Sequence, residues 1–559
     1  MNFIKKYIPK EGSVSIERIK WIFGADTDSR VVSAAYRIND NDEHGFPVYV
    51  NAGAAQSEDY RIIIEPDRIE IYSDGAAGAF YALVTLGNFI KQSSVLECCE
   101  IYDAPDMSYR GFYQDITRGK IPKLETLKNL ADTLAEYKIN SLQLYVEHAF
   151  EFEEYASCRD KSGYMTKEEM KELDRYCHER FIELVPSLSC FGHLYHLLSI
   201  DKYKHLAELR NYQPKYHYWY ERMKHHTINP LCEESFELIK SLIDQYIPCF
   251  MSDKFNICCD ETFDLGTDVN KGRDKAEMYT GFVKKLIAYL QGKGKTVMMW
   301  GDIILNHPEK LAEIPKDVIM LNWDYEPYPN ENNVKLFAEK MERQIVCSGS
   351  WSWNNLSENV NDAERNIDNL TAYGYKYGAE GILHTNWGDY GNLCSLEMAH
   401  YSLICSAARG WNKEIKLTDK FRKDVSLSHY GNEQAVVLIA EFGEISEIAD
   451  WEKIILHEKQ DTGEAEYLSV IQKCYDIHKK AEKLNFFSED MKEELIATAD
   501  GYALFAKWNA AQNGIKAECY VNSVQWIEQY KKRWLEKNKP QEVSEAVRLF
   551  EQAEEMTMA

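Results

Sequence analysis

The sequence has 559 residues, a length that favours two to four folded domains. Hydrophobic residues make up 45% of the chain and aromatic residues 13%, which is ample for burial and excludes a disordered protein. The 65 basic and 90 acidic side chains give a formal net charge of −25, so the overall field would repel DNA or RNA and argues against a nucleic-acid partner.

The first twenty residues, MNFIKKYIPKEGSVSIERIK, are charged and lack the apolar run of a secretory signal. No later stretch approaches the roughly 18 uncharged apolar residues of a membrane span, so we expect a soluble, cytoplasmic protein that does not enter membranes. The 14 cysteines agree with this location. They are scattered or directly adjacent, without the C-x2-C pairs of zinc sites, and we expect reduced, buried thiols.

Residues 1–103 are predicted to form a small α/β domain. The stretch YRIIIEPDRIEIYSD contains two short β-rich runs separated by a Glu-Pro-Asp turn, and the following GAAGAFYALVTLGNFIKQ has the periodic apolar pattern of a helix. Turn residues at 103–106 then indicate a linker to the next domain.

Residues 104–411 show a repeating pattern in which short apolar runs alternate with helical segments such as LETLKNLADTLAEYK. The runs are YRGFYQDI, SLQLYV, IELVPSLS, FNICCDE, TVMMWGD, VIMLNWDY, QIVCSGS and GILHTNWGD. Eight β-then-α units in about 300 residues predict a (β/α)8 TIM barrel. An open doubly wound sheet is the alternative, but no glycine-rich fingerprint follows the first strand.

Residues 412–559 change to long charged helical segments, such as AEYLSVIQKCYDIHKKAEKL and MKEELIATADGYALFAKWNAAQ. We therefore expect a C-terminal α-helical domain, and the fold class is α/β with a barrel between a small N-terminal domain and this helical one.

The chemistry of such a barrel lies at the carboxyl ends of its strands. Those ends are rich in polar and aromatic side chains. Taken strand by strand, they are Asp115 and Arg118; Glu147 and His148; His193; Asp260 and Glu261; Trp300 and Asp302; Trp323, Asp324 and Tyr325; Trp351 and Trp353; Trp387 and Asp389.

Tryptophans recur at these strand ends with carboxylates between them. Any one of them, taken alone, is explained by core packing, because tryptophan is highly buried on average. As a set they predict a pocket with flat apolar walls and a polar floor. Pyranose rings fit such a pocket, since their C–H faces pack on indole while their hydroxyls bond to carboxylate and guanidinium.

Asp260 and Glu261 are adjacent at the end of an apolar run. Neighbouring strand residues point to opposite faces, so both acids serve one pocket only if the strand ends or bulges there. The following ETFDLG offers such an exit. The alternative is structural, with one acid capping the next helix or pairing with a lysine.

Four motifs carry a resemblance to a known family. RGFYQDITR with Asp115 and Arg118, FGH ending in His193, the DE pair and NWGDYGN occur in the order found in glycoside hydrolase family 20, the β-N-acetylhexosaminidases. The likeness covers the barrel and, more loosely, the N-terminal unit through SDGAAGAFYALVTL. In its compact form and in the absence of a signal, the chain is similar to the hexosaminidase D-like branch of this family.

The resemblance implies a retaining, exo-acting hydrolysis of terminal β-linked GlcNAc or GalNAc, in which the substrate's own 2-acetamido oxygen attacks the anomeric carbon to give an oxazolinium intermediate. By position, Glu261 would be the general acid and base, and Asp260 would orient the acetamido group. Arg118 would bind ring hydroxyls, with His193 and Glu147 as partners behind the pocket. The full sugar-binding set implied is Arg118, His193, Glu147, Trp300, Trp323, Tyr325, Trp353, Trp387 and Asp389.

The chain departs from the family pattern at three places. One of them is SLSCFGH, which stands where the family has an E-x-x-P-G-H type stretch. Cys258 and Cys259 stand where the family usually has small residues, often glycine. The tyrosine that grips the acetamido group after strand seven is replaced, since SGSWSWN supplies Trp351 and Trp353, and we take Tyr325 as its substitute.

Two other functions stay open. One is a barrel glycosidase with a protein nucleophile, in which Asp302, Asp324 or Asp389 lies about 5 to 5.5 Å from the acid Glu261. The other is a catalytically silent sugar-binding protein, against which both acids and Arg118 weigh.

We predict no metal and no cofactor. His225 and His226 are adjacent rather than four apart on a helix, so they do not form a zinc motif and are expected on the surface or in a loop. The preference between GlcNAc and GalNAc, the linkage and dimerisation are left open.

Overall fold

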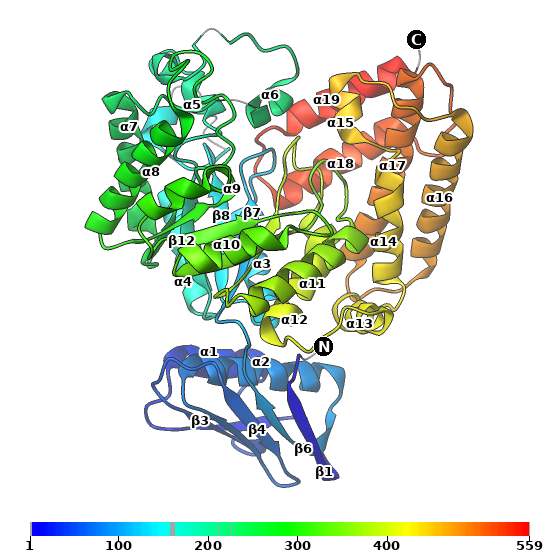
Figure 1. Cartoon of the computed structure of the whole chain (residues 1–559). Helices are drawn as coiled ribbons and strands as arrows, with labels where there is room; N and C mark the ends of the chain where they lie inside the picture. The colour runs from blue at the N-terminus through cyan, green and yellow to red at the C-terminus, as the bar shows by residue number, and fades with distance from the viewer. Residues whose placement is uncertain (1–2, 157–162, 211, 225, 558–559) are drawn as a thin grey trace.

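The computed structural model describes residues 3–156, 163–210, 212–224 and 226–557. Figure 1 shows three parts: a small α/β unit in blue, a barrel running from cyan to yellow-green, and an array of helices in yellow to red that lies beside the barrel. The predicted fold class is confirmed, because the chain forms a closed barrel flanked by an N-terminal sheet domain and a C-terminal helical region.

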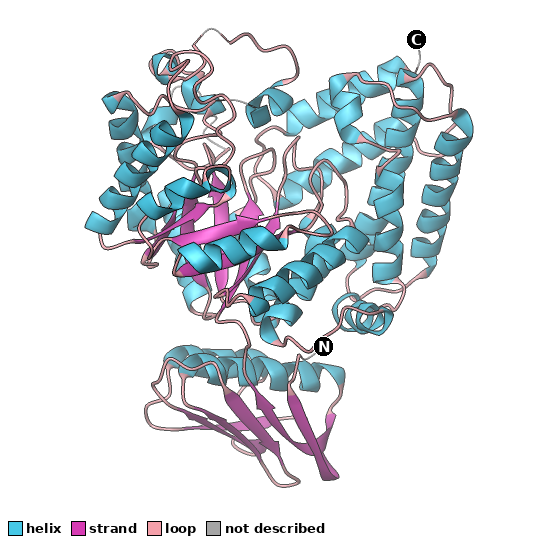
Figure 2. Ribbon diagram, viewed as in Figure 1, coloured by secondary structure: helices cyan, strands magenta, loops and turns pink. Residues whose placement is uncertain are grey.

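The N-terminal part is a mixed sheet with strand order β1-β6-β4-β5-β3-β2. Figure 2 shows its helices α1 (Ser29–Ile38) and α2 (Ala76–Gln92) on the sheet face that is turned toward the barrel. The two predicted β runs form β4 and β5, and the predicted helix is α2. The strands are β1 (Lys6–Ser15), β2 (Ile19–Phe23), β3 (Phe46–Ala52), β4 (Tyr60–Ile64), β5 (Ile69–Ser73) and β6 (Val95–Asp103).

Each of the eight predicted apolar runs overlaps a strand of the barrel, whose order is β10-β11-β12-β13-β14-β7-β8-β9 within the described residues. All neighbouring pairs are parallel, and a pairing of Asn256 with Ser187 closes the ring. The strands are β7 (Tyr109–Asp115), β8 (Ser141–Val146), β9 (Glu183–Leu188), β10 (Lys254–Asn256), β11 (Thr296–Trp300), β12 (Ile319–Trp323), β13 (Arg343–Gly349) and β14 (Gly381–Asn386).

A helix follows each barrel strand, and its start is often fixed by a side-chain cap. Thr166 and Glu169 form a capping box at the start of α4, and Asp274 caps α8. The helices are α3 (Leu124–Glu136), α4 (Lys167–His178), α7 (Glu233–Tyr246), α8 (Lys275–Gly292), α9 (Asp302–Leu305), α10 (Glu331–Lys340), α11 (Val360–Lys376) and α12 (His400–Trp411).

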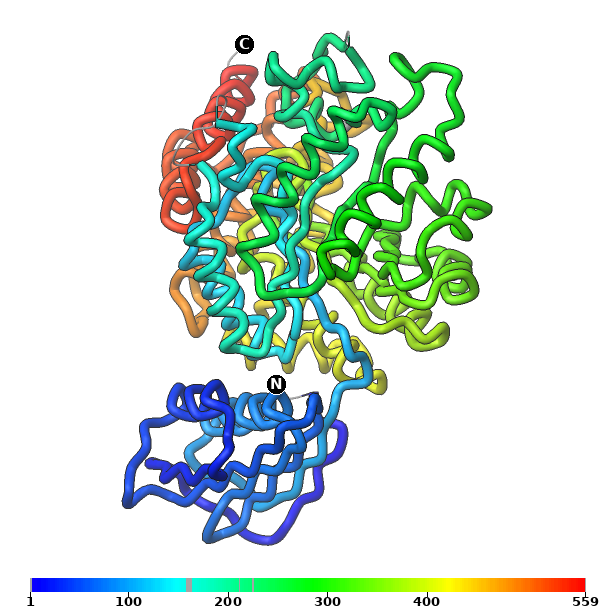
Figure 3. The backbone as a smooth tube through the Cα atoms, turned by 90° about the vertical axis from the view of Figure 1, so that its left-hand side faces the viewer, coloured from blue at the N-terminus to red at the C-terminus, as the bar shows by residue number. Residues whose placement is uncertain are grey.

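The C-terminal region is helical, as its sequence predicts. Its two longest helices, α16 and α17, pack against each other, and the last helices, drawn in red in Figure 3, return to the side of the barrel. No helix in the described residues is long and apolar enough to cross a bilayer. The helices are α13 (Asp419–Val425), α14 (Ala435–Ser446), α15 (Trp451–Leu456), α16 (Glu464–Lys483), α17 (Glu489–Gln512), α18 (Ser523–Lys537) and α19 (Val543–Met556).

A candidate active site at the carboxyl ends of the barrel strands

A pocket of about 370 Å³ lies at the carboxyl ends of the barrel strands. This volume falls in the usual range for small-molecule sites. Of the predicted site residues, only His193 and Glu147 do not line the pocket, and both are buried behind it. The lining residues are Arg118, Met223, Asp260, Glu261, Trp300, Trp323, Asp324, Tyr325, Glu326, Trp351, Trp353, Trp387 and Asp389.

The adjacent acids reach one pocket because the strand stops before them. β10 ends at Asn256, and Cys258, Cys259 and Glu261 have positive φ angles of 55°, 64° and 45°. These left-handed residues break the strand's alternation, so oxygens of Asp260 and Glu261 lie within 4.8 Å of each other and of a His193 nitrogen. The two cysteines therefore occupy a backbone conformation that favours glycine.

The FGH motif fits against this turn. A Cβ on Gly192 would lie 2.7 Å from the carbonyl oxygen of Asp260, so only glycine allows the two segments to approach this closely. His193, the next residue, also has a positive φ of 56°. Strained backbone on both sides of the acid pair is typical of a functional site.

His193 lies between the two acids. Its Nε2 is 3.5 Å from Oδ2 of Asp260 and 3.3 Å from Oε2 of Glu261. Burial by itself would lower the pKa of His193, but the negative charge of Asp260 and the closeness of both carboxylates outweigh it and raise the pKa to about 10. At neutral pH the ring is therefore a buried cation that holds the two carboxylates together.

Asp302 fixes the backbone of Glu261 from the neighbouring strand. Its Oδ2 accepts a hydrogen bond of 3.0 Å from the Glu261 N–H. Burial, followed by the nearby charge of Asp260, raises the pKa of Asp302 to about 7. Asp302 is not among the residues that line the pocket, so it supports the Glu261 backbone from outside the pocket.

Arg118 is buried at the base of the pocket in a network of polar partners. Its Nη1 donates to Oδ1 of Asp389 at 2.9 Å and its Nε to Oε1 of Glu147 at 3.4 Å. Its Nη2 donates to the hydroxyl of Tyr145 at 3.3 Å and contacts Nδ1 of His193 at 3.4 Å. Burial raises the pKa of Asp389 to about 6, although the charge of Arg118 opposes the shift.

Aromatic side chains form a wall of the pocket that begins at Arg118, whose guanidinium carbon lies 5.1 Å from the ring centroid of Trp387. Trp323 stacks on Tyr325 with ring centroids 4.9 Å apart, and Trp353 packs on the same tyrosine at 5.4 Å. The indole N–H of Trp387 donates to the Tyr325 hydroxyl at 2.7 Å. Trp300 is fully buried and packs against Trp387 at 5.9 Å, so it forms the floor.

Sequence reasoning missed three residues of this region: Met223, Tyr145 and Glu326, which lines the pocket from the loop after β12. Met223 reaches the pocket from α6 (Tyr218–Lys224), which lies in the long segment between β9 and α7 and carries no strand-end signal. Tyr145 hydrogen-bonds Glu147 at 2.9 Å as well as Arg118. Its position two residues before Glu147 near the end of a strand is the signal that could have identified it.

Asp324, one of the alternative nucleophiles, lines the pocket but is bound by its own loop. Both carboxylate oxygens of Asp324 accept backbone N–H groups, from Glu326 at 3.1 Å and from Asn330 at 2.7 Å, so this acid shapes its own loop. His226 lies in a loop beside Glu221, and His225 lies outside the described residues.

Comparisons with known proteins assign this barrel. Residues 107–399 match the family model of the glycosyl hydrolase family 20 catalytic domain, and residues 22–104 match that of the family's domain 2. The chain is therefore a glycoside hydrolase. It belongs to glycosyl hydrolase family 20, as the sequence motifs predict.

Relatives of the chain include members of the same family. A Beta-hexosaminidase of Porphyromonas gingivalis is 25% identical over 46% of this chain, and the match spans only 38% of that relative. Hexosaminidase D of Bos taurus is 22% identical over 52% of this chain and 84% of the relative. The solved β-N-acetylhexosaminidase of Bacteroides fragilis has the same fold, with a TM-score of 0.62 at 17% identity over 76% of this chain and 93% of that one.

Proposed function

We propose that the protein is an exo-acting, retaining β-N-acetylhexosaminidase that removes terminal β-linked GlcNAc or GalNAc through an oxazolinium intermediate. The observation that carries the proposal is the geometry of the acid pair. Asp260 and Glu261 face one pocket with the His193 cation between them, and a tryptophan-lined wall lies opposite. A sugar ring stacked on that wall has both carboxylates beside its anomeric carbon.

In the proposed first step, Glu261 acts as the general acid. It donates its proton to the glycosidic oxygen while the substrate's acetamido oxygen forms a bond to C1 and the C1–O bond to the leaving group breaks. Glu261 suits this role because it is the more exposed acid, with 29% of its side chain accessible against 10% for Asp260. Water then forms a bond to C1 while the bond between C1 and the acetamido oxygen breaks, which restores the acetamido group. Glu261 takes the proton from the water and is restored.

Asp260 has a different role in this proposal. The oxazolinium ring carries positive charge that develops as the acetamido oxygen attacks, and a fixed carboxylate in a dry site stabilises it. Asp260 is buried and is held by the same imidazolium that contacts Glu261. Arg118 and Asp389, which are paired at 2.9 Å, present donors and an acceptor to the ring hydroxyls.

Matched nitrophenyl glycosides test the proposal. Turnover of the N-acetyl-β-glucosaminide or galactosaminide is expected to exceed that of the β-glucoside by orders of magnitude, because the 2-hydroxyl sugar lacks the internal nucleophile. A thiazoline analogue of the intermediate is expected to inhibit tightly. Comparable rates on the glucoside, or a 2-fluoro sugar trapped on Asp302 or Asp389, would replace substrate assistance with a protein nucleophile.

A further inference from the structure

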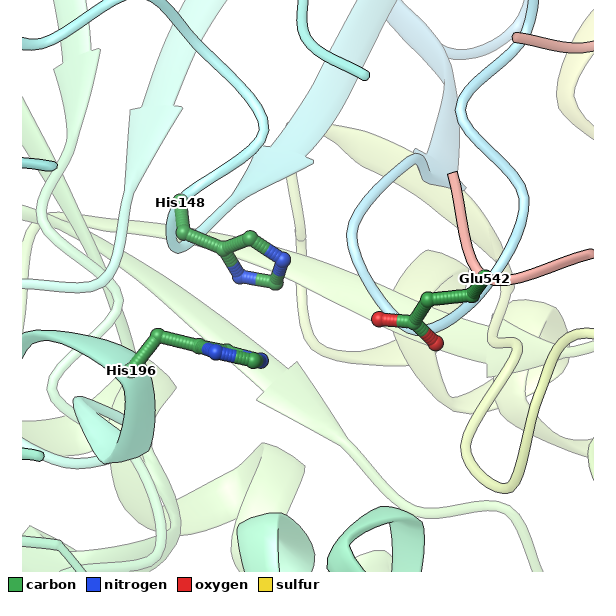
Figure 4. Close-up of side chains that lie close together, drawn as sticks. All are labelled: His148, His196 and Glu542. Atoms are coloured by element: carbon green, nitrogen blue, oxygen red, sulfur yellow. The ribbon is translucent and has the colours of Figure 1, made fainter. Parts of the chain in front are cut away.

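A second cluster of metal-binding side chains lies where the barrel meets the last helix. His148 follows β8, His196 lies in α5 (Tyr195–Leu198), and Glu542 immediately precedes α19. Figure 4 shows the two imidazoles side by side and the Glu542 carboxylate facing them. One ligand atom from each residue lies within 4.8 Å of the others, and the two ring centroids are 3.9 Å apart.

The imidazoles of this cluster are buried without hydrogen-bond partners. Both ring nitrogens of His148 and Nε2 of His196 have no partner among the described residues. Buried polar atoms are almost always satisfied, so three unpaired nitrogens in one place require an explanation. A neutral imidazole carries one ring nitrogen with a free lone pair, which is the group that binds a metal ion.

We propose that His148, His196 and Glu542 bind a divalent transition-metal cation of the Zn²⁺ type, with water completing the coordination. Two imidazoles and one carboxylate form a known zinc donor set. Zinc bonds of about 2.0 to 2.2 Å in a tetrahedron place ligand atoms about 3.4 Å apart. One ligand atom from each of the three groups already lies within 4.8 Å of the others, so a contraction of about 1.4 Å or less reaches that spacing.

Neighbouring residues hold the proposed ligands in place, as the residues that hydrogen-bond to the ligands do in known metal sites. Trp219 Nε1 donates to Oε2 of Glu542 at 2.6 Å, and Arg222 Nη1 donates to Oε1 at 3.0 Å and to Oε2 at 3.1 Å, so Oε1 is the oxygen that keeps a lone pair for the cation. Oε2 of Glu147 lies 3.9 Å from Nδ1 of His148, beyond hydrogen-bonding distance. The carboxylates of Glu147 and Glu542 offset the opposing charge of Arg222.

The proposed site lies close to the surface, because His196 also lines a separate surface pocket together with Glu153 and Asp201. Once bound, the metal links the loop after β8, the helix after β9 and the turn before α19. It therefore ties the C-terminal helices to the barrel, and it does so one residue away from Glu147, which contacts Arg118.

Metal binding by the full-length protein tests the proposal directly. Chelator-treated protein is titrated with Zn²⁺ in competition with a chromogenic chelator, and one equivalent is expected to bind. His148→Ala and His196→Ala are each expected to weaken binding at least about 100-fold, beyond the 10- to 100-fold effect of losing an outer partner. His205→Ala is the control, because His205 is half-exposed and pairs only with Glu234 in the described structure.

One competing site is built into the chain, since His193, Asp260 and Glu261 also lie within 4.8 Å of one another. Zinc uptake that survives both cluster variants and is lost in His193→Ala would overturn the proposal, as would the absence of uptake by the wild type. Anomalous diffraction from zinc-soaked wild-type crystals decides the case even if the variants do not fold. A peak between His148, His196 and Glu542 is expected, and its absence contradicts the assignment.

Discussion

Glu261 combines exposure to the pocket with a backbone that its neighbours fix. Its N–H is held by Asp302, its carboxylate faces the His193 cation, and 29% of the side chain is open to the site. A carboxyl in this position can approach a glycosidic oxygen without losing its support. This geometry supports the proposed role of Glu261 as proton donor, and substitution tests that role directly.

Replacing Glu261 with glutamine is expected to lower kcat/KM on an unactivated N-acetylglucosaminide by roughly 10²- to 10⁴-fold, because an amide cannot donate the proton. An activated leaving group needs less protonation, so a nitrophenyl glycoside is expected to recover part of the rate. The same substitution at Glu277, an exposed residue that pairs with Lys310, is the control. Wild-type turnover of the unactivated glycoside by Glu261→Gln would refute the assignment.

The charge on His193 predicts a dependence of stability on pH. Its pKa in the folded protein is raised from 6.5 to about 10, so the protonated ring stabilises the fold fully below about pH 6.5 and loses this contribution as the pH rises toward 10. The stability difference between the wild type and His193→Gln, measured by urea unfolding, is therefore expected to shrink over that window. A difference that stays constant from pH 6 to pH 10 would show that the ring is neutral.

Individual site residues could be predicted from the sequence where they stand at the end of a strand. Asp260, Arg118 and Trp387 follow apolar runs, and the barrel brings their side chains to one pocket. The same logic could not identify Met223, because α6 lies in a segment without strand periodicity. Met223 reaches the pocket because the long segment between β9 and α7 folds back toward the barrel.

The sequence predicts the positions of the barrel strands better than it predicts their lengths. The run FNICCDE reads as seven strand residues, yet β10 spans only Lys254–Asn256. The left-handed backbone at Cys258 and Cys259 ends the strand, and nothing in the side-chain pattern reveals it. β1 (Lys6–Ser15) was not anticipated for a related reason: nearly all of its residues are exposed, so the apolar alternation of a strand is missing.

The loop after β12 carries the tyrosine that the sequence analysis assigned to the acetamido group. Tyr325 stacks on Trp323 and accepts the Trp387 N–H, so its hydroxyl is held at the pocket wall. Tyr325→Phe is expected to lower kcat/KM for N-acetyl substrates about tenfold, the worth of one hydrogen bond.

Tyr328→Phe is the matched control, because Tyr328 lies in the same loop but is 78% exposed. Steady-state rates on N-acetyl and 2-hydroxyl glycosides separate the effects. An equal loss on both substrates would mean that Tyr325 supports the wall without contacting the acetamido group.

At the scale of the whole molecule, one buried carboxylate joins the N-terminal sheet to the barrel. Asp103, at the end of β6, accepts hydrogen bonds from Tyr60 at 2.6 Å, from the Lys138 ammonium at 3.1 Å and from the Trp411 indole at 3.0 Å. Sequence reasoning marked Asp103 only as a linker residue. Its partners lie on other elements far along the chain, and no local pattern connects them.

The last prediction concerns this junction. Asp103→Asn removes the anion facing Lys138, whose ammonium is almost fully buried, and an uncompensated buried charge costs about 3 to 5 kcal/mol. Urea unfolding is expected to shift to a clearly lower midpoint. Asp106→Asn is the control, because Asp106 lies in the same linker and its ion pair with Lys5 is more exposed. This variant is expected to lower the free energy of unfolding by at most about 1 kcal/mol. The double variant Asp103→Asn with Lys138→Met removes both charges and is expected to recover part of the loss. If Asp103→Asn unfolds at the same midpoint as Asp106→Asn, the buried pair does not hold the N-terminal domain on the barrel, and packing of α2 and Trp411 carries that junction instead.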